Sequence, residues 1–307
     1  MLRNEKILIT GAAGQVAWPI ARELGKHNNV YALARFGSDA DRARLQAQGI
    51  TCLAADLAGE SFAAVPDDFT YVLHFAVLRS DDFDRDLVAN AEGTTRLMHH
   101  TRRAKAWLHC SSMRVYQYAG HVPIKETDAL GDPVARALRD RRRNVTYSVS
   151  KIVAEVLARF AARQWDIPTS IARLTVPYGS NGGWPARHLD ALLARQPIPV
   201  HVDRPSTYNP IHEDDYTAHI PKLLAAATVP ATVVNWGGAA VSIEDWCTYM
   251  GQLLGIAPRF LYTDQTLASM EVDLTRMHTL IGPAMVTWRD GLRRMIRARH
   301  PELALHG

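Results

Sequence analysis

Cysteine is scarce in this sequence. Only Cys52, Cys110 and Cys247 occur in 307 residues, and no two of them lie close together. A disulfide framework needs an even and dense set of cysteines, and a cysteine-based zinc site needs closely spaced pairs, so both are excluded. Unpaired cysteines are typical of a reducing compartment, and we therefore expect a cytoplasmic protein.

Long apolar runs are also missing. No stretch of 18 apolar residues occurs, and the first residues lead into a strand-like segment without a basic, apolar leader. We expect no membrane association.

The 13 histidines show no His-Glu-x-x-His spacing, so we expect no metal site.

Positive charge is only slightly in excess. The formal net charge is +4, and arginines gather in segments 136–143 and 289–299. No nucleic-acid recognition motif accompanies them, so we expect charged, solvated faces and no nucleic-acid partner. For segment 136–143 a lid or an anion-gathering patch is an equal alternative.

A glycine-rich turn follows the first strand-like segment. Residues 6–9 are mostly apolar, the sequence Thr-Gly-Ala-Ala-Gly-Gln-Val-Ala starts at Thr10, and a helical segment then continues to about Gly25. Strand, glycine turn and helix in this order are the context of a dinucleotide-binding fingerprint, in which helix amides face the pyrophosphate. We expect the turn to contact a dinucleotide through Gly11, Gly14, Gln15 and Val16.

The residue after the second strand distinguishes the two nicotinamide dinucleotides. Residues 30–33 are expected to form this strand, and an acidic residue after it would hold the ribose 2′-hydroxyl of NAD. Ala34 stands there instead, and Arg35 follows. A 2′-phosphate meets no repulsion there, and the planar guanidinium can pair with it. We therefore predict NADP, with NAD as the alternative if Arg35 stacks on the adenine or points to solvent.

Two further strand-like segments place residues along the cofactor. One leads to Asp56 and Leu57, expected at the adenine ring, and another ends in Phe75 and Ala76. Ligands of open α/β sheets bind at the carboxyl ends of the strands, which supports both placements. His74, at the same strand end, is interpreted as a structural hydrogen-bonding residue.

A phenol and an ammonium lie four residues apart at Tyr147 and Lys151, near the start of a helical, apolar-periodic segment. This spacing puts both on one helix face. A nearby ammonium favours the phenolate, so the phenol can exchange a proton with a carbonyl or an alcohol. Ser112, after the strand-like residues 107–110, would complete a catalytic triad. The alternative is a surface tyrosine packed on a lysine stem.

Together these segments resemble the extended short-chain dehydrogenases/reductases of the NAD-dependent epimerase/dehydratase superfamily. The likeness covers nearly the whole chain, with further matching motifs at 173–179, 211–215, 235–238 and 288–292. It rests on the glycine turn, the His-Phe-Ala strand end at 74–76, Asn90 ahead of Gly93-Thr94, the Ser-Ser-x-x-Val-Tyr segment at 111–116, and Tyr147 with Lys151. The resemblance implies an α/β fold, a Rossmann-type doubly wound parallel sheet with a smaller C-terminal substrate-binding lobe.

The resemblance also implies residue roles. Tyr147 would be the general acid/base, Lys151 would activate it and bind the nicotinamide ribose, and Ser112 would orient the substrate oxygen. Asn90 would help to hold the proton-relay geometry, and Val176 is expected beside the cofactor.

The same resemblance implies a division of the chain. A dinucleotide-binding domain is expected at 1–176, with a return to it at about 208–236. The substrate-binding lobe is expected at 177–207 and 237–307. We expect the substrate to contact Met113, Trp184 and Tyr208.

Two departures from the family pattern narrow the substrate. Members that dehydrate nucleotide sugars have an acidic pair directly after the catalytic hydroxyl residue, where this chain has Met113 and Arg114, so dehydration is not expected. Nucleotide-sugar epimerases hold the diphosphate with polar residues where this chain has Val176 and Tyr208. Apolar surface there suggests a substrate without a nucleotide, although Arg204 or Arg187 could take over the phosphate.

Three functions remain open at this point. The first is an NADP-dependent oxidoreductase that interconverts a carbonyl and an alcohol on a small substrate. The second is an epimerase of a sugar or nucleotide sugar, and the third a cofactor-binding regulatory protein with an idle site. The resemblance further suggests a homodimer through helices at about 83–103 and 147–163.

Overall fold

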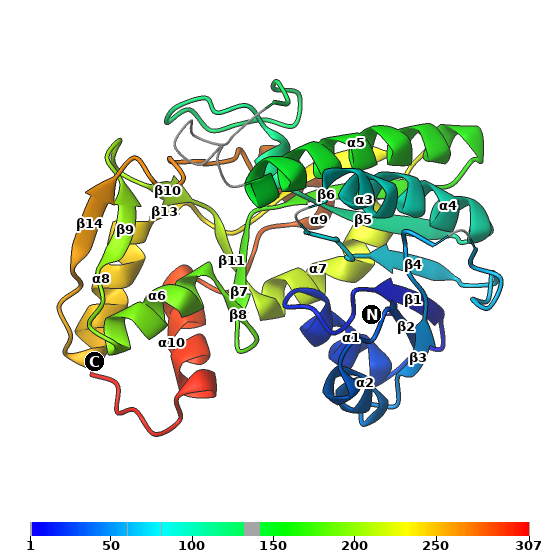
Figure 1. The fold of residues 1–307 in the computed structure, drawn as a ribbon. Coiled ribbons are helices and arrows are strands. Elements are labelled where there is room, and N and C mark those ends of the chain that lie inside the picture. The colour runs from blue at the N-terminus through cyan, green and yellow to red at the C-terminus, as the bar shows by residue number, and fades with distance from the viewer. Residues whose placement is uncertain (1, 60, 81, 132–141, 307) are drawn as a thin grey trace.

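The computed structural model describes residues 2–59, 61–80, 82–131 and 142–306. They form two lobes of unequal size (Figure 1). Most of the arginine-rich segment 136–143 lies outside the described residues, so its interpretation as a solvated face or a lid stays a prediction.

Seven parallel strands form the central sheet of the larger lobe, in the order β12-β6-β5-β4-β1-β2-β3. The chain starts in the middle of the sheet and builds first toward one edge and then toward the other. The predicted doubly wound, Rossmann-type sheet is therefore confirmed. Its strands are β1 (Lys6–Thr10), β2 (Asn29–Ala34), β3 (Thr51–Ala54), β4 (Tyr71–His74), β5 (Ala106–Ser112), β6 (Thr169–Leu174) and β12 (Thr232–Trp236).

The inner strands are buried because helices cover both faces of the sheet. Every residue of β5 and β6 is buried, as expected for parallel strands that no face exposes to water. Side chains alternate between the two layers, so Ile7 and Ile9 join one core cluster and Leu8 joins the other.

The helices of the larger lobe form two layers (Figure 1). One layer contains α1 (Ala17–Gly25), α2 (Asp39–Gln46), α7 (Glu213–Ala225) and α9 (Thr275–Ile281). The other contains α3 (Phe83–Leu87), the π-helical turn η1 (Val88–Glu92), α4 (Gly93–His100) and α5 (Arg142–Gln164). Within the described part of the chain, no helix combines the length and the apolarity needed to cross a bilayer.

The helix expected over residues 83–103 is interrupted by η1. Asn90 in this turn bonds both backbone groups of Leu78: Leu78 N donates to its Oδ1 (2.6 Å) and its Nδ2 donates to Leu78 O (2.7 Å). The next turn passes so close to the loop after β3 that a Cβ on Gly93 would lie 2.2 Å from Leu57 O. These two contacts with distant loops explain why a continuous helical pattern is locally widened.

The smaller lobe has its own core, built around Trp246, Leu189 and Met295. Its helices are α6 (Trp184–Leu193), α8 (Ile243–Leu254) and α10 (Trp288–Arg299). Its strands, and those that join it to the larger lobe, are β7 (Val176–Gly179), β8 (Gly182–Gly183), β9 (Ile198–His201), β10 (Thr207–Tyr208), β11 (Pro210–His212), β13 (Val241–Ser242) and β14 (Phe260–Thr263). The short helix η2 (Met113–Val115) also packs against this core. The predicted domain boundaries stay a prediction.

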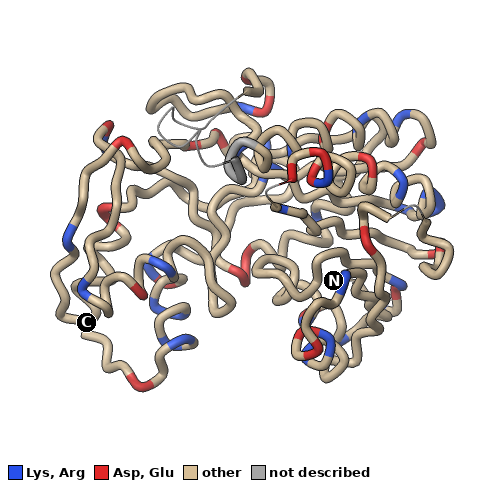
Figure 2. The backbone as a smooth tube through the Cα atoms, viewed as in Figure 1, with Lys and Arg blue, Asp and Glu red and all other residues tan. Residues whose placement is uncertain are grey.

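Basic residues recur along α10 (Figure 2). Arg294 pairs with Asp290 and with Asp214 of α7, each at 2.7 Å, and Arg299 pairs with Asp190 at 3.2 Å. Of the five arginines in 289–299, Arg294 and Arg299 thus have acidic partners.

A buried ion pair fastens α5 to the sheet. Arg173 of β6 donates to both carboxylate oxygens of Glu155, at 2.9 Å from Nε and 2.7 Å from Nη2, and both side chains are 1% exposed. Ser111 of β5 donates a third hydrogen bond to Glu155 (2.5 Å). Burial opposes the charge of Arg173, but the hydrogen bonds and the charge of Glu155 outweigh it and raise the pKa of the guanidinium.

Glu155→Gln should lower the free energy of unfolding by ~3–5 kcal/mol, because it leaves the buried guanidinium of Arg173 without a counter-charge. Urea denaturation measures the loss. The matched control is Glu23→Gln, which breaks an exposed pair with Lys26 and should cost at most ~1 kcal/mol. Equal losses for the two variants would show that the buried pair does not anchor α5.

Candidate functional site

The glycine turn lies against the end of β4. Gly11 has φ +67°, and a Cβ at this position would lie 2.9 Å from Ala76 Cα, so the turn needs glycine both for its backbone conformation and for the close approach. Gly14 N donates to Gly11 O (2.8 Å), and Val16 stands at the N-cap of α1. Gly11 and Ala76, each predicted to lie along the cofactor, are therefore in contact.

Gln15 links the glycine turn to the segment after β6. Its Nε2 donates to Pro177 O (2.9 Å), next to Val176, and Nδ2 of Asn181 donates back to Gln15 O (3.1 Å). Val176 is buried in β7, where it pairs with Pro210 of β11. The expected cofactor residues Gln15 and Val176 thus lie where the two lobes meet.

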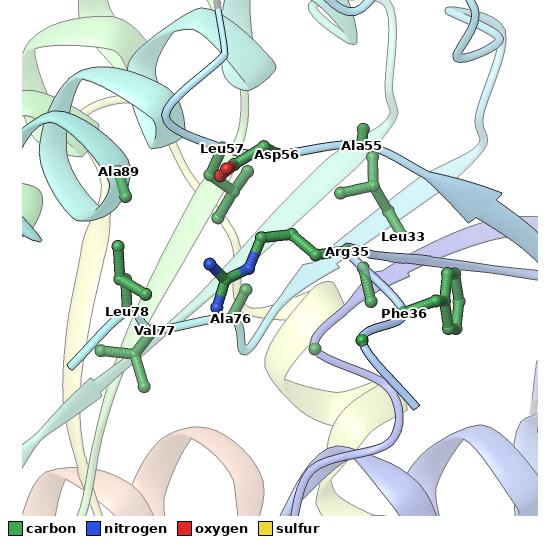
Figure 3. A pocket seen from close by; sticks show the side chains of 13 residues that line it. Leu33, Arg35, Phe36, Ala55, Asp56, Leu57, Ala76, Val77, Leu78 and Ala89 are labelled. Atoms are coloured by element: carbon green, nitrogen blue, oxygen red, sulfur yellow. The ribbon is translucent and has the colours of Figure 1, made fainter. Parts of the chain in front are cut away.

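A pocket of about 250 Å³ opens at the carboxyl ends of β1, β2, β3 and β4. In Figure 3 the side chain of Arg35 extends across it toward Ala76, with Asp56 and Leu57 on the opposite wall. The sequence prediction supplied the lining residues Gly11, Arg35, Asp56, Leu57 and Ala76.

Sequence reasoning missed other lining residues of this pocket. Phe36, Val77, Leu78 and Ala89 also line it. Each lies within two residues of a predicted residue along the chain, and that proximity was the available signal.

The structure brings Tyr147, Lys151 and Ser112 to the carboxyl end of β5. Lys151 is buried, and its Nζ donates to Cys110 O (2.7 Å), two residues before Ser112. Tyr147 lies one helical turn before Lys151 on the same face of α5, and the guanidinium of Arg114 lies 5.5 Å from its ring centroid. Ser112 Oγ accepts a hydrogen bond from Arg114 N (3.3 Å).

A directed chain of hydrogen bonds runs beneath this site. Thr10 Oγ1 accepts from Phe75 N (3.1 Å) and Ala76 N (3.0 Å), so its own hydroxyl donates to His74 Nδ1 (2.9 Å). His74 Nε2–H then donates to Thr94 Oγ1 (2.8 Å), whose hydroxyl donates to the backbone oxygen of Asn90 (2.7 Å).

The imidazole of His74 is neutral in this chain of hydrogen bonds. Burial, assisted by the positive charge of Lys151, lowers its pKa to about 3. This geometry agrees with the interpretation of His74 as a structural hydrogen-bonding residue. Two of the predicted cofactor residues join this chain of hydrogen bonds through backbone groups. The amide of Phe75 donates to Thr10, and the carbonyl of Asn90 accepts from Thr94.

The three expected substrate residues lie in or beside the core of the smaller lobe. Tyr208 is fully buried, its hydroxyl donates to Ala268 O (2.5 Å), and its ring packs edge-on against Trp184 at 5.0 Å. In this structure Tyr208 is a packing residue, because its polar atom is already bonded to backbone. Met113 is buried as well, whereas Trp184 is only partly buried at the start of α6.

Potential metal ligands do not cluster in the described ranges: no group of three or more His, Cys, Asp or Glu side chains there could hold an ion.

Comparison with known proteins identifies the family of the chain. A model of the NAD dependent epimerase/dehydratase family matches residues 7–237. No curated protein matches the sequence.

Solved structures similar to this chain share its whole fold. A UDP-N-acetylglucosamine 4-epimerase from Methanobrevibacter ruminantium M1, in complex with UDP-N-acetylmuramic acid, superposes with a TM-score of 0.83 at 15% identity, covering 98% of this chain and 100% of that one. A UDP-glucuronic acid 4-epimerase from Bacillus cereus, in complex with UDP-glucuronic acid and NAD, gives 0.81 at 20% identity, covering 96% and 99%. A dTDP-glucose 4,6-dehydratase from Streptomyces venezuelae with NAD bound gives 0.79 at 20% identity, covering 96% and 97%.

The glycine turn against β4, the Tyr-x-x-x-Lys face of α5 and the family match over three quarters of the sequence agree with one another. The chain belongs to the NAD-dependent epimerase/dehydratase family, a family of enzymes within the extended short-chain dehydrogenases/reductases.

Proposed function

We propose that this enzyme oxidises and reduces a hydroxyl-bearing carbon of its substrate, with Tyr147 exchanging the proton. The observation that supports this most is the placement of Tyr147 on the face of α5 that Lys151 fastens to the end of β5, next to Ser112.

The residues present fit a nicotinamide dinucleotide. A Cβ on Gly11 would fill the space against Ala76, and the pocket beside it takes its walls from the ends of four parallel strands. In our proposal Asp56 and Leu57 hold the adenosine part, and the glycine turn faces the pyrophosphate. When bound, the nicotinamide supplies or accepts the hydride.

The side chains at the end of β5 would handle the proton. Tyr147 would give a proton to a carbonyl oxygen, or take one from an alcohol. Ser112 Oγ accepts a hydrogen bond from the amide of Arg114, which leaves its own hydroxyl proton available to a substrate oxygen. Lys151 donates one of its three ammonium protons to a hydrogen bond with Cys110 O, and this bond fixes the ammonium beside the phenol.

We favour epimerisation of a sugar or a nucleotide sugar as the net reaction. The family match and the similarity to two sugar-nucleotide epimerases support this choice over the simple oxidoreductase that Val176 and Tyr208 suggested from sequence. Dehydration is disfavoured because Met113 and Arg114 follow Ser112 where the dehydratases of the family have an acidic pair.

A second candidate is a net NADP-dependent oxidoreductase that acts on a small substrate without a nucleotide. The extension of Arg35 across the pocket favours NADP, because a guanidinium there can pair with a 2′-phosphate (Figure 3). Val176 and Tyr208 are buried and offer no polar group to a diphosphate.

Cofactor release in a single turnover separates the two candidates. An epimerase oxidises and then reduces the same carbon. After rapid mixing with substrate and one turnover, we therefore expect the cofactor to be in the redox state in which it started. Absorbance at the nicotinamide band measures this. One equivalent of altered cofactor per turnover would reject epimerisation and support the net oxidoreductase.

Tyr147→Phe should lower kcat by roughly 10²- to 10⁴-fold, because the variant lacks the proton that general acid/base catalysis needs. Its affinity for the cofactor, measured by fluorescence titration, should stay close to that of the parent enzyme. The control is Tyr262→Phe, which removes an exposed phenol from the smaller lobe. Full activity of the Tyr147 variant would contradict the proposal that Tyr147 exchanges the proton.

Arg35→Ala should weaken the binding of NADPH by roughly 10- to 100-fold, the loss expected for a hydrogen-bonded charge pair. The binding of NADH should change much less, because it has no 2′-phosphate, and titration of the same preparation with both cofactors provides the internal control. An equal loss for both would mean that Arg35 does not select NADP.

The homodimer and the cytoplasmic location stay predictions. Exposed apolar side chains on α3 and α5, Phe83, Val156 and Phe160, support a partner chain on this face. Three free cysteines support a reducing compartment.

A further inference from the structure

A cleft of about 840 Å³ opens at the β12 edge of the central sheet. Residues of β12 form part of its wall, and residues of α5 and of α9 line it from the two helix layers. It shares no lining residue with the pocket at the ends of β1, β2, β3 and β4. The cleft is therefore a second site, separate from the proposed cofactor pocket.

Positive charge is in excess in this cleft. Four basic side chains line it, one from the segment between η2 and α5, two from α5 and one from α9: Lys125, Arg159, Arg163 and Arg276. Two carboxylates also line it, those of Glu126 and Asp273. Four positive charges against two negative ones leave an excess of two.

The two carboxylates of the cleft already accept hydrogen bonds from the backbone. Glu126 Oε1 accepts from Asn235 N (2.8 Å), and Asp273 Oδ1 accepts from Thr275 N (2.7 Å). Each carboxylate thus holds a piece of backbone in place and is less available to the cations around it.

Arg159 brings an unmet hydrogen-bond donor to the cleft. Its Nη2 lies 3.8 Å from Glu155 Oε2, beyond hydrogen-bond distance, because Glu155 is already bonded to Arg173 and Ser111. Its Nε is buried and has no acceptor in the described part of the chain. A buried donor without an acceptor costs free energy, and an anion in the cleft would supply the acceptor.

The other cations are also available to a ligand. Lys125 and Arg163 are exposed, and neither side chain forms an ion pair within the described residues. Arg276 donates from Nε to Val233 O (2.8 Å), which fixes its guanidinium and leaves both Nη groups for a further acceptor.

We propose that this cleft binds a doubly charged phosphate ester, with the phosphate held by the arginines and the organic part against the apolar wall. That wall consists of Pro230, Ala231 and Leu280. A phosphate monoester carries close to two negative charges at neutral pH, which matches the excess of two in the lining. Its oxygens match the planar fork of a guanidinium. The proposal does not depend on the reaction at Tyr147.

The edge of the sheet favours a small ligand over an added strand. A further strand would need the outward backbone groups of β12. Arg276 occupies Val233 O, and Glu126 occupies Asn235 N. The polar groups that remain for a ligand are those of side chains, which suit an anion.

Phenyl phosphate and phenol test the proposal as a charged probe and its neutral counterpart. Calorimetry measures their affinities for the full chain with NAD at a saturating concentration, so that the phosphate positions of the cofactor are filled. We expect saturable binding of phenyl phosphate and much weaker binding of phenol, because only the first brings the two negative charges.

Arg159→Met and Arg163→Met should each weaken the binding of phenyl phosphate by roughly 10-fold or more, as expected for the loss of a charge-assisted hydrogen bond. Arg163 is exposed and has no partner among the described residues, so a loss in this variant does not come from unfolding. The control is Arg297→Met, which removes an exposed arginine of α10 in the smaller lobe and should leave the affinity unchanged.

Several results would overturn the proposal. They are an absence of saturable binding, equal affinities for phenyl phosphate and phenol, unchanged affinity in both Arg159→Met and Arg163→Met, or an equal loss in Arg297→Met. A change of oligomeric state in Arg159→Met and Arg163→Met, with the affinity for phenyl phosphate intact, would also overturn it and assign the two arginines to a contact between chains.

Discussion

The buried pair of Glu155 and Arg173 determines how α5 sits on the sheet. Tyr147, Lys151 and Glu155 are spaced by four residues, so they share one face of the helix. Glu155 is bonded to β5 through Ser111 and to β6 through Arg173, and Lys151 is bonded to Cys110 O. These bonds fix the rotation and the height of the helix, and the position of the phenol follows from them.

The cofactor side of the site depends on a second buried network. The chain from Thr10 through His74 and Thr94 to Asn90 ties the glycine turn, the end of β4 and the π-helical turn together. Because His74 stays neutral, each group in the chain has one defined donor direction. Two loops that approach a dinucleotide from different strands therefore keep a fixed distance, and they meet the phenol of α5 across the end of β5.

The sequence predicted the elements that depend on local patterns. The apolar segments predicted the strands of the sheet, and the predicted glycine turn places Gly11 where only glycine fits. It missed features that depend on contacts between distant segments. The π-helical turn depends on contacts with Leu78 and Leu57. The burial of Tyr208 depends on its hydrogen bond to the backbone at Ala268. No residue next to Arg79 in the sequence indicates its contact with Tyr147.

The central claim is that the anchored face of α5 presents its phenol to a bound nicotinamide. A crystal structure of the full chain with NAD or NADP tests it most directly. The account predicts that Tyr147 Oη and Ser112 Oγ both lie within about 3.5 Å of one position beside the nicotinamide ring, where a substrate oxygen can sit. A bound nicotinamide with the phenol oxygen of Tyr147 out of reach of that position would contradict the account.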